Sequence, residues 1–345
     1  MSRFLDLSPE ERAVYIHQAA AKLNVNPVIV EKDLWVSWML GRLFEDPNAA
    51  EHFVFKGGTS LSKVFGAIQR FSEDIDLGVF LEVVGWDEAR LDAAQSRTQL
   101  DKLFKQLQAA CGTWVNDILR PKLEASIRKT LGEPESDATW LSYTWDATGS
   151  AAVLNFAYPS VLPSVTGYIA PIVKLEFGSH PNQQPRGPHA VRSLLAEALG
   201  SAFEEFSEAF SVNVIALEVE RTFREKATIL HAEFHRPSNS SMRDRYARHY
   251  SDLAALWLHP AGQAALKRYD LLSEVAMHKQ RFFGNAWTSF NSAAPGTLRL
   301  APPNARMAEL KLDYEKMQPM FLKPPVPFDQ VIGTLVEAEQ LINSR

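Results

Sequence analysis

Cysteine is nearly absent from this chain, and positive charge is not in excess. Cys111 is the only cysteine among 345 residues, which excludes an intramolecular disulfide and a cysteine-rich zinc site. The 36 Lys and Arg residues are outnumbered by 41 Asp and Glu residues, and the net charge is −5. A general affinity for nucleic acid is therefore disfavoured, so any contact with RNA requires a local basic patch.

Long hydrophobic runs are also lacking. Residues 1–6 contain no apolar segment of the kind found in signal peptides, and the least charged stretch, 158–173, is interrupted by prolines and a glycine. We therefore expect a cytoplasmic protein with no membrane contact. With 46% hydrophobic and 22% charged residues, the composition is that of a soluble globular protein, and the length suits one large or two ordinary domains.

Two common phosphate-binding signatures and the histidine-based zinc motifs are missing as well. The segment 57–63 lacks the later glycine of the P-loop pattern and the Gly-Lys-Ser/Thr that this glycine begins. No G-x-G-x-x-G occurs either. His231 and His235 stand in an H-x-E-x-H pattern in which Glu233 lies on another face of the helix, and no P-C-x-x-C follows. We therefore predict no zinc enzyme.

What is present is a strand, a glycine turn and a short helix. The aromatic and β-branched run 52–55 predicts a buried strand, which Gly57-Gly58 ends with a turn that larger side chains would block. We expect Thr59 or Ser60 to cap the helix that follows. Its apolar residues at helical spacing are Leu61, Val64, Phe65 and Ile68. The exposed amides at the helix start, together with Lys63, favour an anionic phosphate.

Two acids follow at strand spacing. The run 74–77 places Asp74 and Asp76 on one face of a strand and its apolar residues on the other. Adjacent carboxylates repel each other unless a cation neutralises them, and Mg²⁺ held by one or two carboxylates plus substrate phosphates is the usual partner. Alone, a Gly-Gly turn or an Asp-x-Asp is more often plain structure. Their separation by about one helix favours a site, because strand, turn, helix and strand return the acids to the helix start.

A later strand carries a further charged pair. The run 172–177 alternates, so that Lys174 and Glu176 share one face and the apolar residues share the other. If this strand neighbours the strand of the aspartates, Glu176 completes a three-carboxylate cluster and Lys174 contacts a triphosphate. The alternative is an ordinary surface ion pair on an edge strand, which stabilises little.

The remaining sequence predicts helices at both ends and β structure between them. Ser8-Pro9 predicts one helix start and Asn26-Pro27 a second. The patterns beyond them predict helix over 97–130, short strands over 140–178 and 212–219, and helices from 220 almost to the end. We therefore expect N-terminal helices over 1–48, a core over 49–219 and a helical C-terminal domain over 220–345.

Two helices of that last region carry polar residues beside their apolar stripes. The first leaves Lys226 on the flank of its stripe. In the second, Arg245, His249 and Asp252 align at i, i+4 and i+7, so that Asp252 can orient the imidazole or pair with Arg245. We interpret this arrangement as a structural network that holds two helices together.

Together and in this order, these segments resemble the AbiEii/AbiGii-type nucleotidyltransferase toxins of bacterial toxin–antitoxin pairs. The resemblance extends from about residue 50 to 257. It is carried by Gly57-Gly58-Thr59-x-Leu61-x-Lys63, Arg70-x-Ser72-x-Asp74-Ile75-Asp76-Leu77, Lys174-Leu175-Glu176, Glu225-Lys226 and Arg248-His249-Tyr250-x-Asp252-Leu253. It implies an α+β fold similar to that of DNA polymerase β, with a mixed sheet and a helical C-terminal region.

The resemblance also implies a function and its partners. We expect metal-dependent transfer of a nucleotide from an NTP to an acceptor hydroxyl, which in some relatives belongs to RNA such as the acceptor end of tRNA. The expected cofactor is Mg²⁺ or Mn²⁺. The expected partner is a cognate antitoxin, a separately encoded transcriptional regulator, and the expected setting is phage defence.

Site roles follow from the same resemblance. Asp74 and Asp76 are expected to bind the metal, Glu176 to assist as a third acid and Lys174 to neutralise developing charge. The triphosphate is expected in a cradle formed by Gly57, Gly58, Thr59 and Lys63. Arg70 and Ser72 of the second motif are also expected to bind the nucleotide. Ser72 is expected to contact phosphate or to be modified itself; its alternative is a turn-capping serine. Lys226 and Asp252 are additional candidates.

Two other functions remain open from the sequence. The first is a degenerate module that binds an NTP or a partner protein without turnover; the intact aspartate pair disfavours it, because a pure binder has no evident need for two adjacent carboxylates. The second keeps the enzyme and changes the acceptor to a small molecule or a protein hydroxyl.

Overall fold

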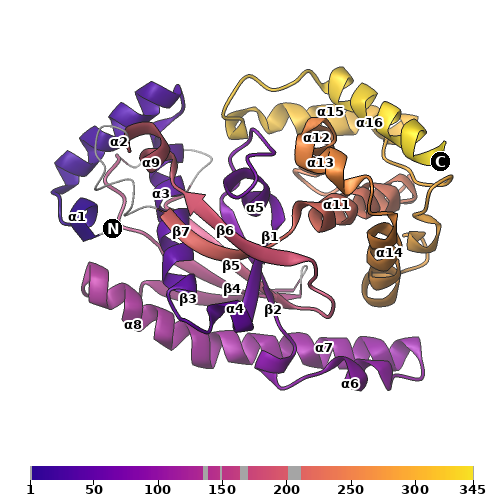
Figure 1. The fold of residues 1–345 in the computed structure, drawn as a ribbon, viewed down its shortest axis with the longest axis horizontal. Helices are drawn as coiled ribbons and strands as arrows, with labels where there is room; N and C mark the ends of the chain where they lie inside the picture. The colour runs from indigo at the N-terminus through magenta and orange to yellow at the C-terminus, as the bar shows by residue number, and fades with distance from the viewer. Residues whose placement is uncertain (1, 135–138, 148–149, 164–169, 201–210, 345) are drawn as a thin grey trace. The chain divides into compact units, whose positions relative to one another are not determined.

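A mixed β-sheet forms the centre of the N-terminal part of the protein (Figure 1). The computed structural model describes residues 2–134, 139–147, 150–163, 170–200 and 211–344. Within these residues the sheet has seven strands, in the order β3 (Leu141–Asp146), β4 (Ala151–Ala157), β5 (Ile172–Ser179), β2 (Asp74–Val79), β1 (Phe53–Lys56), β7 (Ser211–Leu217) and β6 (Arg186–Arg192). Strand β2 runs parallel to β5 and antiparallel to β1. The predicted α+β class with a mixed sheet is confirmed.

The chain divides into two compact units. Unit 1 contains Met1–Val64 and Ser72–Ala216, and unit 2 contains Phe65–Phe71 and Leu217–Arg345. Unit 1 thus holds the sheet together with the N-terminal helices, whereas a short segment before β2 belongs to unit 2. The finer division at residues 49 and 220 stays a prediction.

Two helices of unit 1, α2 and α3, begin where the sequence places their caps. Ser8 and Glu11 form a reciprocal capping box, and the Asn26 side chain accepts a hydrogen bond from the Val28 amide. A π-helical stretch, Val115–Leu119, joins α7 to α8, so the predicted helix over 97–130 is continuous. The helices are α1 (Ser2–Leu5), α2 (Pro9–Leu23), α3 (Pro27–Phe44), α4 (Ala49–His52), α5 (Gly57–Lys63), α6 (Glu88–Asp92), α7 (Arg97–Trp114), α8 (Arg120–Leu131) and α9 (Leu194–Leu199).

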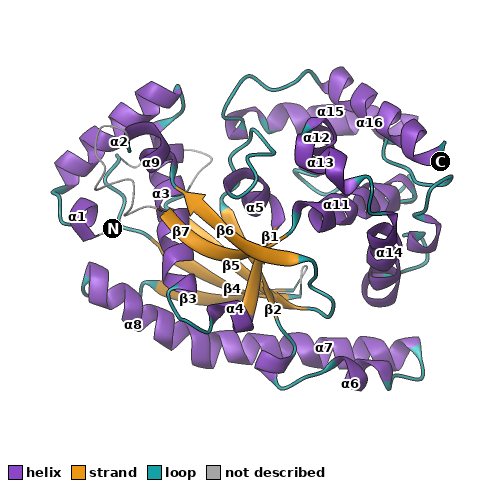
Figure 2. Cartoon of the chain, viewed as in Figure 1, coloured by secondary structure: helices purple, strands orange, loops and turns teal. Residues whose placement is uncertain are grey.

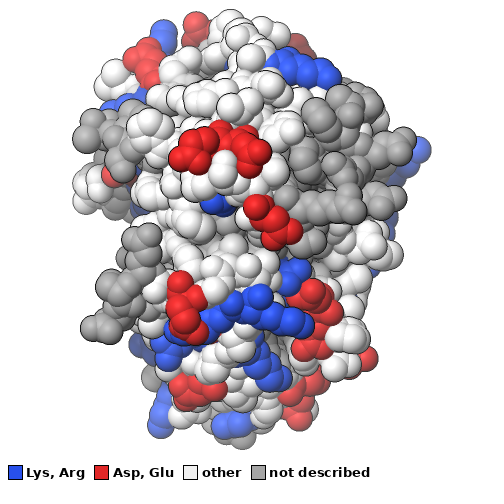
Figure 3. All heavy atoms as spheres, turned by 90° about the vertical axis from the view of Figure 1, so that its left-hand side faces the viewer, with Lys and Arg blue, Asp and Glu red and all other residues white. Residues whose placement is uncertain are grey.

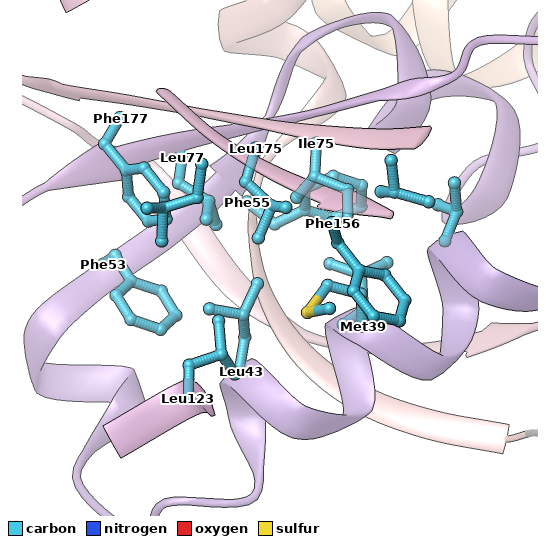
Figure 4. Close-up of a cluster of buried hydrophobic side chains, with 14 of the residues drawn as sticks. Met39, Leu43, Phe53, Phe55, Ile75, Leu77, Leu123, Phe156, Leu175 and Phe177 are labelled. Atoms are coloured by element: carbon cyan, nitrogen blue, oxygen red, sulfur yellow. The ribbon is translucent and has the colours of Figure 1, made fainter. Parts of the chain in front are cut away.

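The main core of unit 1 lies between the sheet and helices α3 and α8 (Figure 4). The alternate residues of β2 and β5 are fully buried, and their side chains point toward Met39 of α3 and Leu123 of α8. The buried strand residues are Ile75, Leu77, Leu175 and Phe177. Because successive side chains of a strand point to opposite faces, the charged residues between them face away from this core.

Unit 2 is helical in the part that the structure describes (Figure 2). Its helices are α11 (Val219–Phe234), α12 (Ala247–Leu258), α13 (Pro260–Ala265), α14 (Tyr269–Phe283), α15 (Met307–Lys316) and α16 (Phe328–Asn343). The predicted helical C-terminal region is confirmed. Among the described residues, no helix combines the length and the apolar character that crossing a membrane requires.

Candidate active site

Strands β2 and β5 bring four of the predicted site residues together. The parallel register pairs Asp74 with Lys174 and Asp76 with Glu176. Neighbouring strands lie about 4.8 Å apart, and residues opposite each other point to the same face. The four side chains therefore stand side by side on the face of the sheet opposite the apolar core, as the alternation of each strand predicts.

This polar face continues onto the flanking strands. Lys56 of β1 lies opposite Asp76, and Asn155 of β4 lies opposite Lys174. The Asn155 amide donates to the Thr144 hydroxyl of β3 at 3.3 Å. The face remains accessible, since the Lys174 side chain is 37% exposed. It is thus a partly open surface with three carboxylates close to two ammonium groups, and a substrate with its own charges can reach it.

Lys174 and Glu176 form an ion pair within β5. Their Nζ and Oε1 atoms are 2.5 Å apart. Burial disfavours the charged ammonium, but the hydrogen bond to Glu176 and the nearby carboxylates of Asp74 and Asp146 outweigh this effect and raise the pKa of Lys174. Lys174 therefore stays positively charged at neutral pH. The role of Glu176 as a third acid stays a prediction.

Gly57 brings the backbone directly against one of the aspartates. Its φ is +81°, a left-handed conformation that glycine adopts easily and other residues rarely adopt. A Cβ atom added at this position would lie 1.9 Å from Oδ2 of Asp76. The turn between β1 and α5 therefore requires glycine at position 57 for two reasons. The backbone angle is one that other residues rarely adopt, and the Asp76 carboxylate occupies the space that a side chain would need.

Helix α5 begins earlier and ends sooner than predicted. The residue at its N-cap is Lys56, whose side chain makes no capping bond, so the predicted cap at Thr59 or Ser60 is wrong. The physical reason is the left-handed Gly57, which turns the chain from strand into helix without a polar cap. The helix ends at Lys63, and three of the predicted apolar residues lie beyond it: Val64, Phe65 and Ile68.

The hydroxyl of Thr59 connects α5 to the strand of the aspartates. It donates to the backbone carbonyl of Asp74 and lies 2.9 Å from Oγ of Ser72. Ser72 therefore sits beside the start of β2, close to the first turn of the helix that also contains Gly58. A phosphate role for Ser72 or Gly58 stays a prediction, whereas the contact that holds α5 against β2 is observed.

Lys63 is engaged by a carboxylate of another helix. Its Nζ lies 2.5 Å from Oδ1 of Asp33 in α3, and both side chains are buried. The second oxygen of Asp33 accepts a hydrogen bond from the Leu194 amide at the start of α9. The end of α5 is thus fixed to α3, and contact of Lys63 with a triphosphate stays a prediction.

Three other predicted residues form a buried network within unit 2. Arg70 makes a two-pronged contact with Asp252, with Nε to Oδ1 at 2.7 Å and Nη2 to Oδ2 at 2.8 Å. Lys226 of α11 lies 2.8 Å from the same Oδ2. Burial opposes ionisation of Asp252, but the two cations outweigh it and hold the pKa of this carboxyl far below its usual range. The predicted network between the two helices is confirmed.

The observed partners of the Asp252 carboxylate come from outside its own helix. They are Lys226 of α11 and Arg70, which is 182 residues away in sequence, whereas the helical spacing suggested Arg245 or His249. A guanidinium binds a carboxylate with two parallel hydrogen bonds, a geometry that an imidazole cannot offer. Helical spacing alone could not identify such a distant partner.

The histidine pair of α11 has a structural explanation. His231 is buried, and its Nε2 lies 3.1 Å from the Ser289 carbonyl, while its Nδ1 accepts a hydrogen bond from the Arg299 amide. Burial lowers the pKa of His231 to about 4. Among the residues that the structure describes, no group of three or more His, Cys, Asp or Glu is placed to hold a metal ion.

Charges on one face of the molecule are mixed. In Figure 3, Lys and Arg side chains are interspersed with Asp, Glu and uncharged residues, and a short row of basic side chains is flanked by acidic ones. Among the described residues visible in this view, no broad basic surface forms. This agrees with the net charge of −5.

Sequence reasoning missed three consecutive charged residues in α3. Glu31, Lys32 and Asp33 are all buried, although all three side chains are ionisable. The sequence contained the signal, because they interrupt a helix that is otherwise apolar on every side from Val28 to Val36. Charges in such a helix must be buried and therefore paired.

Comparison with known proteins gives the class to which this fold and site belong. Residues 38–334 match the family described as nucleotidyl transferase AbiEii toxin, type IV toxin–antitoxin system. Since this covers most of the chain, the chain belongs to that family. It is a nucleotidyltransferase and a toxin of a type IV toxin–antitoxin system, and the family implies an antitoxin as its partner.

Several chains in solved structures match this chain, and one of them is a toxin. MenT4, a nucleotidyltransferase toxin from Mycobacterium tuberculosis H37Rv, is 15% identical in sequence, with a TM-score of 0.45 over 98% of this chain and 90% of that chain. No protein with a curated description matches the chain.

Proposed function

We propose that the face formed by β2 and β5 transfers a nucleotide from an NTP, with a divalent metal, to a hydroxyl of RNA, in particular the 3′ end of tRNA. The observation that supports this most is the parallel register of Asp74 with Lys174 and of Asp76 with Glu176, which gathers acids and a cation on one partly exposed face. The acceptor class comes from the resemblance to the family.

The donor groups of this face fit Mg²⁺ or Mn²⁺. Such ions take one or two carboxylates and complete their coordination with water and substrate phosphates, so Asp74 and Asp76 would hold the ion. When bound, the ion would neutralise charge on the phosphates of the NTP. The close approach of Gly57 to Asp76 also fits, because it leaves backbone rather than a side chain next to the carboxylate.

The protein's own residues supply positioning and charge. The acceptor hydroxyl attacks the α-phosphorus in line, the bond to the bridging oxygen of the β-phosphate breaks, pyrophosphate leaves, and the hydroxyl proton passes to solvent. This reaction needs mainly alignment and charge neutralisation. The ammonium of Lys174, held in place by Glu176, counters the charge on the phosphoryl oxygens.

The biological setting belongs to the same proposal. The antitoxin is a separately encoded transcriptional regulator, and the pair acts in phage defence. Both statements are supported by family membership alone. They predict that expression of the chain without its antitoxin arrests growth, and that growth resumes when the antitoxin is supplied.

Incubation with each of the four NTPs, labelled at the α-phosphate, tests the acceptor class directly. The reactions contain Mg²⁺ and, in parallel, total cellular RNA, a protein extract freed of RNA, or small molecules of the same cells. Label in the tRNA band supports the proposal. Label only in protein or in small molecules would reassign the acceptor, and label in none of the fractions, with NTP bound, would favour a module without turnover.

A further inference from the structure

Three buried charges stand in a row on helix α3. Glu31, Lys32 and Asp33 are only 2%, 3% and 4% exposed. Successive residues of a helix point about 100° apart, so three neighbours reach three different segments of the surrounding structure. A buried charge persists only where a partner compensates it. The partners of these residues therefore show which parts of unit 1 the helix holds in place.

Lys32 connects the starts of the two site strands. Its Nζ lies 2.5 Å from Oε2 of Glu73, the residue directly before Asp74, and 3.1 Å from the carbonyl oxygen of Ala170, two residues before β5 begins. One ammonium group thus contacts residues that lie just before the N-terminal ends of both β2 and β5. The register between these strands is what places the acids beside Lys174.

The neighbours of Lys32 fix the segments around it. Asp33 holds Lys63 at the end of α5 and the Leu194 amide at the start of α9. Glu31 accepts hydrogen bonds, both of 2.7 Å, from the Ser160 hydroxyl and the Val161 amide, in the segment that follows β4. The three side chains together connect helix α3 to the residues that precede β2 and β5, to the end of α5, to the start of α9 and to the segment that follows β4.

We propose that Lys32 is a positioning residue for the metal-binding acids. It holds Glu73 and Ala170 at a fixed separation, and thereby sets where Asp74 stands relative to the β5 strand. This inference rests on the proposed function, because it assumes that the acids hold a metal ion. It assigns Lys32 no contact with substrate.

The test separates positioning from general stability. Lys32→Met removes the ammonium, and the double variant Lys32→Met/Glu73→Gln also removes the negative charge that this ammonium contacts. The control is Leu34→Ala, a buried change in the same helix. Leu34 belongs to a different apolar cluster, which includes Leu195 of α9, and its truncation destabilises unit 1 without touching either strand entrance.

Three quantities are measured for each variant: thermal melting, Mn²⁺ binding in the presence of a non-hydrolysable NTP by electron paramagnetic resonance, and nucleotide transfer at saturating NTP. We expect Lys32→Met to weaken Mn²⁺ binding at least tenfold. Leu34→Ala should keep wild-type Mn²⁺ affinity despite a lower melting temperature. The double variant should regain melting temperature without regaining Mn²⁺ affinity.

The contrary outcomes are equally distinct. The inference is overturned if Lys32→Met keeps the wild-type Mn²⁺ affinity. It is also overturned if the double variant regains Mn²⁺ affinity together with its melting temperature. If Lys32→Met does not fold, the double variant decides. A wild-type protein that binds Mn²⁺ but transfers no nucleotide refutes the proposed function and leaves the affinity test of Lys32 in force, whereas a wild type without Mn²⁺ binding overturns both.

Discussion

Replacement of Gly57 by alanine is the smallest change that should disable the site. A methyl group at this position would overlap Oδ2 of Asp76, 1.9 Å away, and would come within 2.9 Å of its Cβ. Real Cβ atoms do not approach so closely, so either the carboxylate or the turn must move. The change therefore alters the position of one acid and leaves every functional group in the chain intact.

Two magnitudes follow from the structure. Alanine at a φ of +81° costs about 1–2 kcal/mol of backbone strain. For a unit of this size that corresponds to a fall in melting temperature of roughly 2–8 °C. A displacement of about 1 Å at a catalytic group can lower a rate roughly 100-fold. We therefore expect Gly57→Ala to fold, to melt slightly earlier, and to lose about two orders of magnitude in transfer.

Gly66→Ala is the matched control. Gly66 also has a positive φ, +58°, but an added Cβ there would meet nothing within 4 Å. It should cost a similar strain energy and keep nucleotide transfer within about threefold of the wild type. Initial rates with an α-labelled NTP and thermal melts give both comparisons. Equal activity in the two variants would refute the argument that Gly57 makes room for Asp76.

Asp76→Asn should reduce transfer at least about 100-fold with little change in melting, because it removes charge from a partly exposed site; a folded and fully active variant would contradict this. Asp252→Asn should destabilise unit 2 by about 3–5 kcal/mol in urea, because Arg70 and Lys226 stay buried without a counterion. The folded pKa of Asp252 is depressed, so this loss should be constant above about pH 5 and shrink only in stronger acid; a loss that grows toward acid pH would contradict the assignment. The pKa of His231 falls to about 4, below an unfolded value of about 6.5, so the unfolded state takes up its proton first and wild-type stability should fall by up to about 3 kcal/mol between pH 6.5 and 4. His231→Gln should flatten this dependence in urea unfolding at several pH values, and an unchanged slope would refute it.

The sequence was most informative where local periodicity decides the structure. Alternation of charged and apolar residues placed Asp74, Asp76, Lys174 and Glu176 on one face each, and the two strands have that pattern of burial. A residue's face in a strand follows directly from its position, so this part needs no knowledge of distant contacts. That the two strands are neighbours could only be assumed, because strand order depends on the whole sheet.

Predictions failed where a single backbone angle or a distant partner decides. The left-handed Gly57 starts α5 without a polar cap, and no propensity rule reveals which of two adjacent glycines adopts that angle. Asp252 is neutralised by Arg70, and Lys63 by Asp33, across long stretches of sequence. Lys63 and Arg70, which their motifs suggest as phosphate ligands, form buried ion pairs in this structure. Only the tertiary fold could show these pairs.

If the Asp74–Asp76 face is the active site, it transfers a nucleotidyl group and not a phosphate, and the position of the label in the product distinguishes the two. Total tRNA is incubated with Mg²⁺ and an NTP labelled either at the α- or at the γ-phosphate, with the wild-type protein and with Asp74→Asn side by side. We expect α-label joined to the tRNA 3′ end, γ-label released in pyrophosphate, and neither product with Asp74→Asn or after removal of the metal by chelation. Transfer of the γ-label, or undiminished transfer by Asp74→Asn, would contradict it.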